Sequence, residues 1–254
     1  MNTSRRVVQG RFSGHPPSGG GLVLGEEPVR PAGIGSPLID RSLSWIDLAI
    51  AQLGPHEFRR RLWHFAPGVL SLVGSSLLPF AQPVPPLVVP VMALLAVGVA
   101  VAAVYWNHSI RRPGESYCLQ SILGYSVSVI PLFAFFPSQP ELALTVAGIL
   151  AFGDGCATLV GLLAGRKKLP WNGRKTWAGT FAFVLAAMPL AVFIYWCGSV
   201  PHPSLGLAAL CVAPAVLAAA AVETLPTRCN DNAFVGMSAA AMVILMHGLV
   251  IGWS

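Results

Sequence analysis

The chain has 254 residues, of which 54% are hydrophobic and only 10% are charged, and its mean hydropathy is +0.66. This composition is far more apolar than that of a soluble domain, so it excludes a soluble enzyme and predicts an all-α, polytopic membrane protein. No nucleic-acid partner is expected. The five cysteines are odd in number and form no CxxC pair, so we interpret them as buried thiols rather than a disulfide or metal site.

The first 41 residues are rich in glycine and proline and have no apolar period. We interpret residues 1–41 as a disordered basic tail and residues 42–254 as one membrane-embedded catalytic domain. Ser44 and Asp47 fit a capping box, and apolar residues then follow at helical spacing. This pattern predicts a short helix at 44–53 that lies in the membrane interface.

About seven stretches are long and apolar enough to cross a membrane as helices, because a span needs about 20 apolar residues. The predicted spans are 62–81, 86–106, 118–136, 141–163, 177–197, 204–222 and 233–253.

All 16 basic residues lie in the tail, just before the first predicted span or in alternate connectors. The intervening connectors, 80–85, 137–140 and 198–203, contain no lysine or arginine. By the positive-inside rule, the cationic side faces the cytosol. The sequence therefore predicts an integral protein of the cytoplasmic membrane with a cytosolic N-terminus and an external C-terminus.

Asp154 lies in the inner half of the fourth predicted span, where an ionisable residue is a candidate functional site. It belongs to a stripe of small residues at steps of three and four, formed with Ala147, Ala151, Thr158, Gly161 and Gly165. Such a stripe can be a helix-packing seam in which Asp154 pairs with an arginine. Alternatively, Asp154 is a Mg²⁺ ligand and forms a pair with Asp231 if spans four and seven meet.

A basic hinge at 165–176 joins the fourth and fifth predicted spans. The charges alone are typical of a positive-inside anchor. However, the hinge leads directly into a helix start, where free N–H groups can bind an anion. On that reading the residues that hold phosphate are Arg166, Arg174, Lys175, Thr176 and Gly179. The Walker A pattern is absent.

Four further polar residues lie on the same predicted face. Glu223 ends the sixth span, and Asp231 with Asn232 opens the seventh. Asp231 can bind metal or nucleotide, and Asn232 is a further candidate to bind the nucleotide. Asp231 can also cap the seventh helix, and both roles are compatible. His64 begins the first span, where it is either a structural histidine or a contact to phosphate or to a substrate hydroxyl.

Four motifs together resemble a known family: Arg60-Arg61-x-x-His64, Gly153-Asp154-x-x-Ala157-x-x-x-Gly161, the segment Gly165 to Lys175-Thr176-x-x-Gly179-Thr180, and Glu223 followed by Asp231-Asn232. Over residues 59–250 the chain resembles the CTP-dependent lipid-alcohol kinases, which include dolichol, polyprenol and phytol kinases and the CTP-type diacylglycerol kinase. The resemblance implies transfer of the γ-phosphoryl group of CTP to a membrane lipid alcohol at the cytosolic face, with Mg²⁺ or another divalent cation.

The resemblance also implies roles for single residues. Asp154 and Asp231 would bind metal, and Glu223 would be a further metal ligand or the base. Arg174, Lys175 and Thr176 would hold the CTP phosphates. The family commonly has Asp-Asp-Asn where this chain has Asn230-Asp231-Asn232, so one carboxylate of that motif is missing.

Other readings of the same residues remain open. A phosphatidate cytidylyltransferase also uses CTP at a membrane, but the long acidic and basic signature of that family is absent near the C-terminus. A small transporter with Asp154 as its ion site would be expected to show repeats, and none is evident. A relative without catalytic activity is the third alternative, because of Asn230.

Overall fold

The computed structural model of the chain describes residues 54–77, 87–105, 118–227 and 231–253. These residues are mostly helical. Their elements in chain order are α2 (Pro55–Leu77), α3 (Val88–Tyr105), α5 (Cys118–Phe135), α6 (Pro140–Gly148), the π-helix η2 (Ile149–Asp154), α7 (Gly155–Ala164), β1 (Lys168–Leu169), β2 (Asn172–Thr176), α8 (Trp177–Gly198), α9 (Leu205–Glu223) and α10 (Asp231–Val250). The predicted tail at 1–41, the interfacial helix at 44–53 and Asn230 lie outside the described residues.

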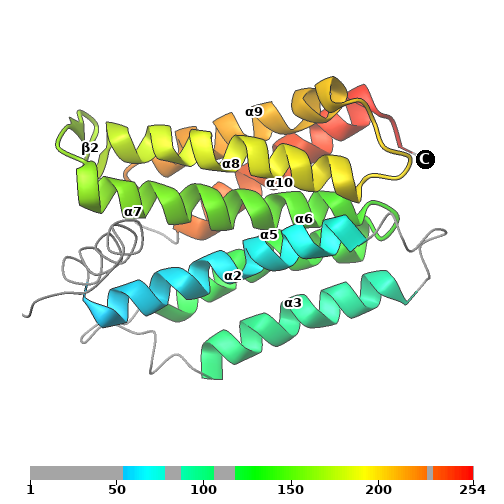
Figure 1. Ribbon diagram of the computed structural model, residues 1–254, viewed down its shortest axis with the longest axis horizontal. Coiled ribbons are helices and arrows are strands. Elements are labelled where there is room, and N and C mark those ends of the chain that lie inside the picture. Colours follow the sequence, from blue (N-terminus) through cyan, green and yellow to red (C-terminus); the bar gives the residue numbers. More distant parts are fainter. Residues whose placement is uncertain (1–53, 78–86, 106–117, 228–230, 254) are drawn as a thin grey trace, which may run out of the picture.

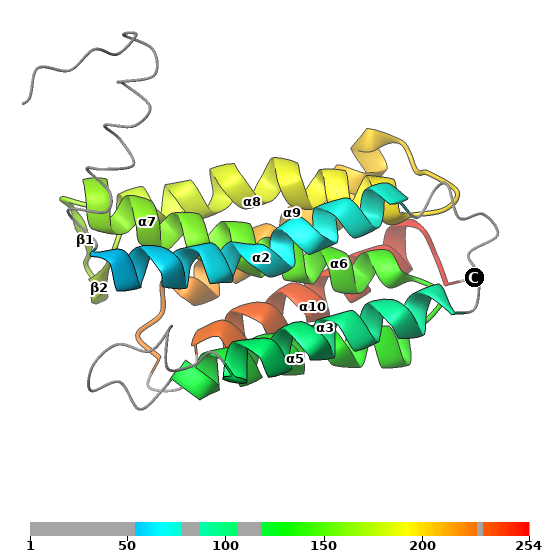
Figure 2. The ribbon, with the colours of Figure 1, turned by 60° about the horizontal axis from the view of Figure 1, so that its bottom comes forward.

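The helices lie roughly along the long axis of the molecule, as Figures 1 and 2 show. Strands β1 and β2 lie at one end, which we call the hairpin end, and the C-terminus lies at the opposite end, which we call the far end (Figure 1). Helices α6, η2 and α7 form one continuous helix, Pro140–Ala164, that packs against α2, α5, α8 and α10. Helix α3 packs mainly on α5 and forms an edge of the bundle.

In the part of the chain that the structure describes, four helices are long and apolar enough to cross a membrane: Pro140–Ala164, Trp177–Gly198, Leu205–Glu223 and Asp231–Val250. They match the four later predicted spans to within a few residues. Helices α2, α3 and α5 also form where the first three spans were predicted, but α2 begins at Pro55 rather than at residue 62. The seven-span count and the orientation in the membrane remain predictions.

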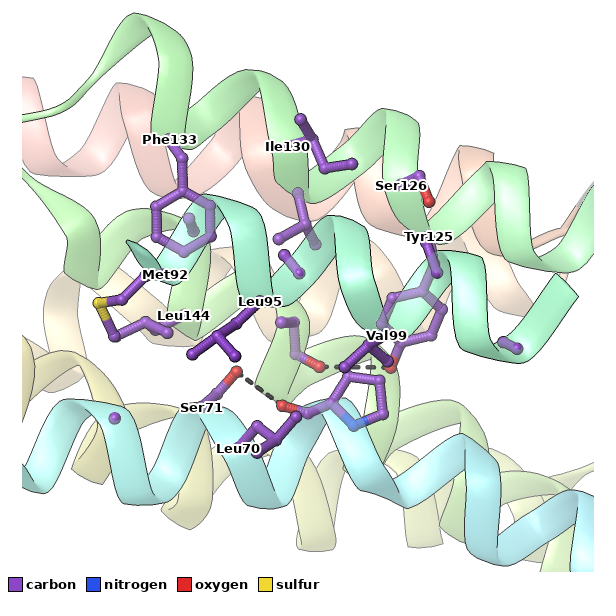
Figure 3. Close-up of a pocket in the computed structure, with 18 of the residues that line it drawn as sticks. Leu70, Ser71, Met92, Leu95, Val99, Tyr125, Ser126, Ile130, Phe133 and Leu144 are labelled. Carbon is purple, nitrogen blue, oxygen red and sulfur yellow. Dashed lines mark hydrogen bonds between the residues drawn. The ribbon is translucent and has the colours of Figure 1, made fainter. Parts of the chain in front are cut away.

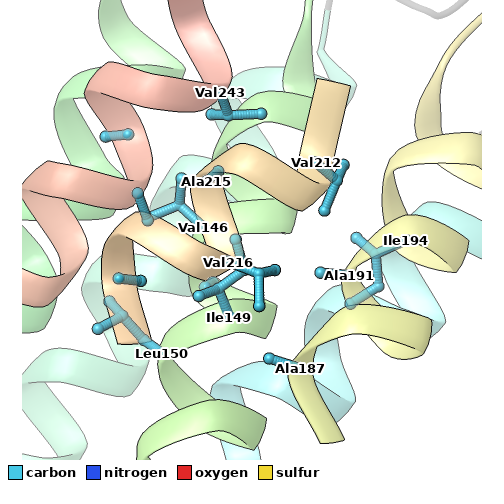
Figure 4. Close-up of a cluster of buried hydrophobic side chains, with 14 of the residues drawn as sticks. Val146, Ile149, Leu150, Ala187, Ala191, Ile194, Val212, Ala215, Val216 and Val243 are labelled. Atoms are coloured by element: carbon cyan, nitrogen blue, oxygen red, sulfur yellow. The ribbon is translucent and has the colours of Figure 1, made fainter. Parts of the chain in front are cut away.

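The buried core is built mainly from α6, η2, α8, α9 and α10 (Figure 4). Ala187 and Ala191 of α8 are fully buried and face larger residues of neighbouring helices, such as Val216. Small residues allow apolar helices to approach closely, which is how membrane helices associate without a hydrophobic driving force between them. By contrast, the outer surface carries exposed side chains such as Leu185 and Leu249, as expected for faces in contact with lipid.

The structure is mostly helical, as predicted, but the basic hinge forms a short antiparallel β-hairpin that the prediction lacked. Lys168 pairs with Thr176 and Leu169 pairs with Asn172, with an irregularity between these two pairs. Pro170 follows Leu169, and proline favours the second position of a tight turn because its φ angle is already fixed there. The hairpin turns the chain back before α8 begins.

Candidate active site

The π-helix η2 positions Asp154 within the longest apolar helix. Single π-helical turns inside α-helices are often found at functional sites. Gly153 lets this turn lie directly against α8, because a Cβ atom at that position would be only 2.6 Å from the ring of Phe183. Asp154 itself has a side chain that is 15% exposed, so it is not sealed in the core.

Asp154 faces His64 of α2. The Nε2 atom of His64 lies 3.1 Å from Oδ2 of Asp154. The ring of His64 also meets the ring of Tyr125 from α5 edge-on, with centroids 5.6 Å apart. The Tyr125 hydroxyl donates a hydrogen bond to the Ala147 carbonyl at 3.3 Å. Three helices therefore contribute to one polar row of Tyr125, His64 and Asp154.

Lys175 of β2 forms the centre of a second polar group at the same end. Its Nζ atom lies 2.5 Å from Oε1 of Glu223 and 3.9 Å from Oδ2 of Asp231. Asp231 also accepts a hydrogen bond from the Thr227 hydroxyl. The Glu223 side chain is only 4% exposed, whereas the Asp231 side chain is 45% exposed. The second group therefore extends from the protein interior to the surface.

The charge on Lys175 links the two groups. Burial alone would lower the pKa of this ammonium, but the nearby carboxylates of Glu223, Asp154 and Asp231 and the hydrogen bond to Glu223 raise it above its ordinary value. Lys175 is therefore a permanent cation among three carboxylates at neutral pH. It can bind an anion without first gaining a proton.

The hairpin holds Lys175 in this place through Asn172. The side-chain amide of Asn172 donates hydrogen bonds to the carbonyls of Thr224 and Leu225, at 3.1 and 3.2 Å. These carbonyls follow the end of α9, where helical partners are lacking. Within β2, Lys175 is partly buried, whereas its neighbour Arg174 is exposed.

The other residues predicted to hold phosphate lie in different surroundings. The Thr176 hydroxyl caps α8 by accepting a hydrogen bond from the Gly179 N–H at 3.1 Å. Gly179 packs so closely on α7 that an added Cβ would lie 2.7 Å from the Ala157 carbonyl. Thr176 and Gly179 thus have structural roles. Arg166 and Arg174 are exposed at the surface. Phosphate binding by these four remains a prediction.

The three predicted metal-binding carboxylates lie at the same end, but Lys175 lies beside two of them. Within the described part of the chain, no three His, Cys, Asp or Glu side chains are grouped closely enough to hold a metal ion by themselves. Metal binding by Asp154, Asp231 and Glu223 therefore remains a prediction.

An apolar pocket of about 380 Å³ adjoins the row of Tyr125, His64 and Asp154 (Figure 3). Helices α2, α3, α5 and α6 form its walls, and almost all of its lining is hydrocarbon. His64, Tyr125 and Asn232 belong to the lining and supply polar groups. The pocket can therefore take a molecule with a long apolar part and one polar end.

Sequence reasoning missed Tyr125, Asn172 and Thr227. Tyr125 and Thr227 stand in stretches with no motif, so no sequence signal marks them. Asn172 is followed by Gly173, which is typical of a turn, and this pattern could have indicated the hairpin. Its two hydrogen bonds to the end of α9 depend on tertiary structure alone.

Comparison with known proteins agrees with the family resemblance noted in the motifs. The chain is 29% identical over 148 residues to a probable chloroplastic phytol kinase of Triticum aestivum, which covers 55% of this chain and 49% of that protein. It is 29% identical over 171 residues to the chloroplastic farnesol kinase of Arabidopsis thaliana, covering 66% and 56%. It is 25% identical over 146 residues to phytol kinase 1 of Arabidopsis thaliana, covering 55% and 48%.

These curated relatives are lipid-alcohol kinases by name, at modest identity. The chain spans about half the length of the curated relatives it matches. No protein-family model matches the chain. No solved structure shows a significant match either.

Proposed function

We propose that the protein is an integral-membrane kinase that transfers the γ-phosphoryl group of CTP to the hydroxyl of a membrane isoprenoid alcohol. The main support for the proposal is that an apolar pocket and a group of charged side chains meet at His64. An apolar pocket ends at His64 and Tyr125, and His64 touches Asp154, whose charge acts on Lys175. A lipid alcohol has the matching shape, with an apolar chain and one hydroxyl.

The acceptor hydroxyl would lie at the polar end of the pocket. There the imidazole of His64 accepts the hydroxyl proton, and the Asp154 carboxylate at 3.1 Å stabilises the resulting positive charge. Glu223 is less suited to this step, because Lys175 already occupies its Oε1 atom. We therefore assign the base role to His64 rather than to Glu223.

The phosphate groups of the donor would lie at the hairpin. Lys175 is a cation on which the charge of Asp154 acts, and Arg166 and Arg174 are exposed cations just before and within the same hairpin. Charge-assisted contacts to phosphate are the strong kind. In the reaction the acceptor oxygen forms a bond to the γ-phosphorus, the bond from that phosphorus to the bridging oxygen breaks, and CDP leaves. The choice of CTP rests on the motif resemblance.

A divalent cation fits the donor chemistry of this end. Mg²⁺ prefers oxygen ligands and is usually held by one or two carboxylates together with substrate phosphates. Asp154 and Asp231 provide such carboxylates, and Asp231 is exposed enough to be reached. Bound Mg²⁺ would neutralise charge on the transferred phosphoryl group. The cationic end faces the cytosol in this proposal, following the positive-inside rule.

The test uses purified protein in detergent with Mg²⁺ and CTP labelled in either the α or the γ position. The acceptors are farnesol, geranylgeraniol, phytol, a long polyprenol, diacylglycerol and phosphatidic acid. We expect γ-label, but not α-label, in an isoprenoid alcohol, and weaker transfer from ATP, GTP or UTP.

Two other outcomes would overturn the proposal. Incorporation of α-label that requires phosphatidic acid, with γ-label released as pyrophosphate, would make the protein a cytidylyltransferase. Absence of any label from lipid, in protein that remains folded, would favour a transporter or an inactive relative.

A further inference from the structure

The apolar pocket is open along one side, between helices α2 and α3. Leu70 and Val73 of α2 and Leu95 of α3 all line the pocket, and between 49% and 59% of each residue is exposed. The lining residues of α5, by contrast, are buried or half-buried. The opening therefore faces outward between α2 and α3, and α5 forms a more closed wall.

The opening forms because α2 and α3 touch only slightly. Helix α3 packs mainly on α5. Toward the far end, the Cε atom of Met92 reaches α2, where it would be only 2.8 Å from a Cβ atom placed on Gly74. Beyond this contact, the α3 residues that line the pocket include the small Ala96, Ala100 and Ala103. Small side chains leave the space between the two helices unfilled.

A groove continues from the opening along α3. Trp63 of α2 lines it together with α3 residues at steps of three and four: Val91, Leu94, Leu95, Gly98, Val99 and Ala102. This spacing places the α3 residues on one face of the helix. Trp63, Leu95 and Val99 also line the pocket, so the groove and the pocket adjoin each other.

Gly98 leaves open space in the groove. A Cβ atom added at this position would have no atom of another residue within 4 Å beyond its own helix and chain neighbours. Leu94, one turn earlier on the same face, is 69% exposed. A larger side chain at position 98 therefore fits without displacing a neighbour, and it would fill the groove.

The groove suits a hydrocarbon chain. From Val88 to Val104, α3 contains no polar side chain, so a water-soluble molecule gains little from this surface. In the proposed membrane setting, the exposed face of α3 meets lipid tails. A lipid alcohol that moves sideways into the pocket keeps its chain in apolar surroundings and its hydroxyl at the level of His64. Its hydroxyl never has to cross the apolar interior, where an unpaired polar group is costly.

We propose that the lipid acceptor enters the pocket sideways from the membrane, through the opening between α2 and α3, with its chain lying in the groove at Gly98. This inference deepens the proposed function and rests on it. Trp63 lines both the groove and the pocket and directly precedes His64 in the chain. The route therefore ends beside the residue assigned as the base.

The experiment places a bulky side chain in the groove. Gly98→Trp fills the groove, and the matched control is Val101→Trp, on the same helix at a residue that is 62% exposed and lines neither the groove nor the pocket. With farnesol and protein in lipid nanodiscs, we expect Gly98→Trp to lower kcat/KM at least about tenfold, mainly through KM, a factor that apolar sites commonly reach. Val101→Trp should stay within about twofold of the unaltered protein. Equal values for the two variants would overturn the proposal.

A short alcohol with one isoprene unit separates the route from the chemistry. It dissolves in water and can reach the polar row from the hairpin end, because the His64 and Asp154 side chains are each 15% exposed. Its kcat/KM should be the same in Gly98→Trp and Val101→Trp. A loss in Gly98→Trp that is equal for farnesol and the short alcohol would also overturn the proposal.

A farnesol analogue with a photoreactive chain tests the route without phosphoryl transfer. In the unaltered protein without nucleotide, we expect more labelling at Leu95 than at Val101, although the two residues are similarly exposed, at 59% and 62%. Unlabelled farnesol should reduce the labelling at Leu95. This result in a protein that transfers no phosphate would support the route and reject the kinase. Equal labelling at the two residues would reject the route and leave the kinase intact.

Discussion

The two ends of the bundle both carry polar side chains, but in different surroundings. At the hairpin end, Asp154, Lys175 and Asp231 are all partly exposed. At the far end, Glu141 is 5% exposed, and the buried Tyr195 hydroxyl lies 2.7 Å from Nδ1 of His247. Both ends thus combine an acid with a histidine, but the side chains named at the far end are buried, whereas those at the hairpin end are partly exposed.

The difference between the two ends shows that an acid in an apolar helix is not sufficient evidence for a catalytic site. Asp154 and Glu141 belong to the same continuous helix, Pro140–Ala164. The far-end groups are enclosed by neighbouring helices, so they can stabilise the fold but cannot meet a substrate. The side chains at the hairpin end are charged and are exposed enough for a substrate to reach them. Variants at the two ends should therefore separate activity from stability.

The largest expected effect is that of Asp154→Asn. We expect kcat/KM for alcohol phosphorylation to fall about 10²–10³-fold, because the variant removes a charge that acts on both His64 and Lys175. The matched control is Glu141→Gln, which makes the same chemical change at the far end of the same helix. Equal loss of activity in the two variants would remove the distinction between the ends.

The next effect is that of Lys175→Ala, which should lower both activity and stability. The substitution leaves the buried Glu223 carboxylate without its cation, at a cost of about 1–3 kcal/mol in the free energy of unfolding. The double variant Lys175→Ala, Glu223→Gln should regain part of this stability but none of the activity. Recovery of activity in the double variant would show that Lys175 only neutralises Glu223.

A smaller effect is expected for Tyr195→Phe at the far end. Loss of the buried hydrogen bond to His247 should reduce the free energy of unfolding by about 0.5–1.5 kcal/mol. The kcat/KM value should stay within twofold of the unaltered protein, roughly 0.4 kcal/mol. Thermal unfolding and kinetics on one preparation provide both readouts. A large kinetic effect with unchanged stability would contradict the structural role of this end.

The smallest expected effect is that of raising the pH. The pKa of Lys175 is raised above the ordinary lysine value of 10.5, because its carboxylate neighbours outweigh burial. Its contribution to stability is therefore fully present below that value and is lost only as the pH rises through the higher folded pKa. The stability difference between the unaltered protein and Lys175→Met should stay constant from about pH 7.5 to 9.5. A difference that shrinks within this window would contradict the raised pKa.

Much of the helical framework could be predicted from composition and hydropathy. Span lengths follow directly from apolar runs, and α8 begins at Trp177, the residue predicted to open the fifth span. The expectation that Asp154, Lys175, Glu223 and Asp231 lie at one end also agrees with the structure, since Lys175 lies beside Glu223 and Asp231 and interacts with the charge of Asp154.

What could not be predicted depends on tertiary contacts. The sequence predicts only a hinge at the hairpin, because the two strands are short and Lys168–Leu169 is too short to show a strand period. The approach of His64 to Asp154 requires α2 to pack on η2, which no local pattern specifies. The pairing of Lys175 with Glu223 joins residues 48 positions apart in the chain. Spacing alone indicated a phosphate site and gave no sign of this ion pair.

The π-helical turn has a consequence for how insertions and deletions act on this chain. A π turn closes over five residues rather than four, so it equals an α-helical turn with one residue added. The turn takes up this extra residue, so deleting one residue within 149–153 would restore a regular α-helix and leave α6 and α7 in nearly the same rotation relative to each other. Asp154 would then stay on the side of the helix that faces His64. This helix therefore has one residue to spare before the aspartate.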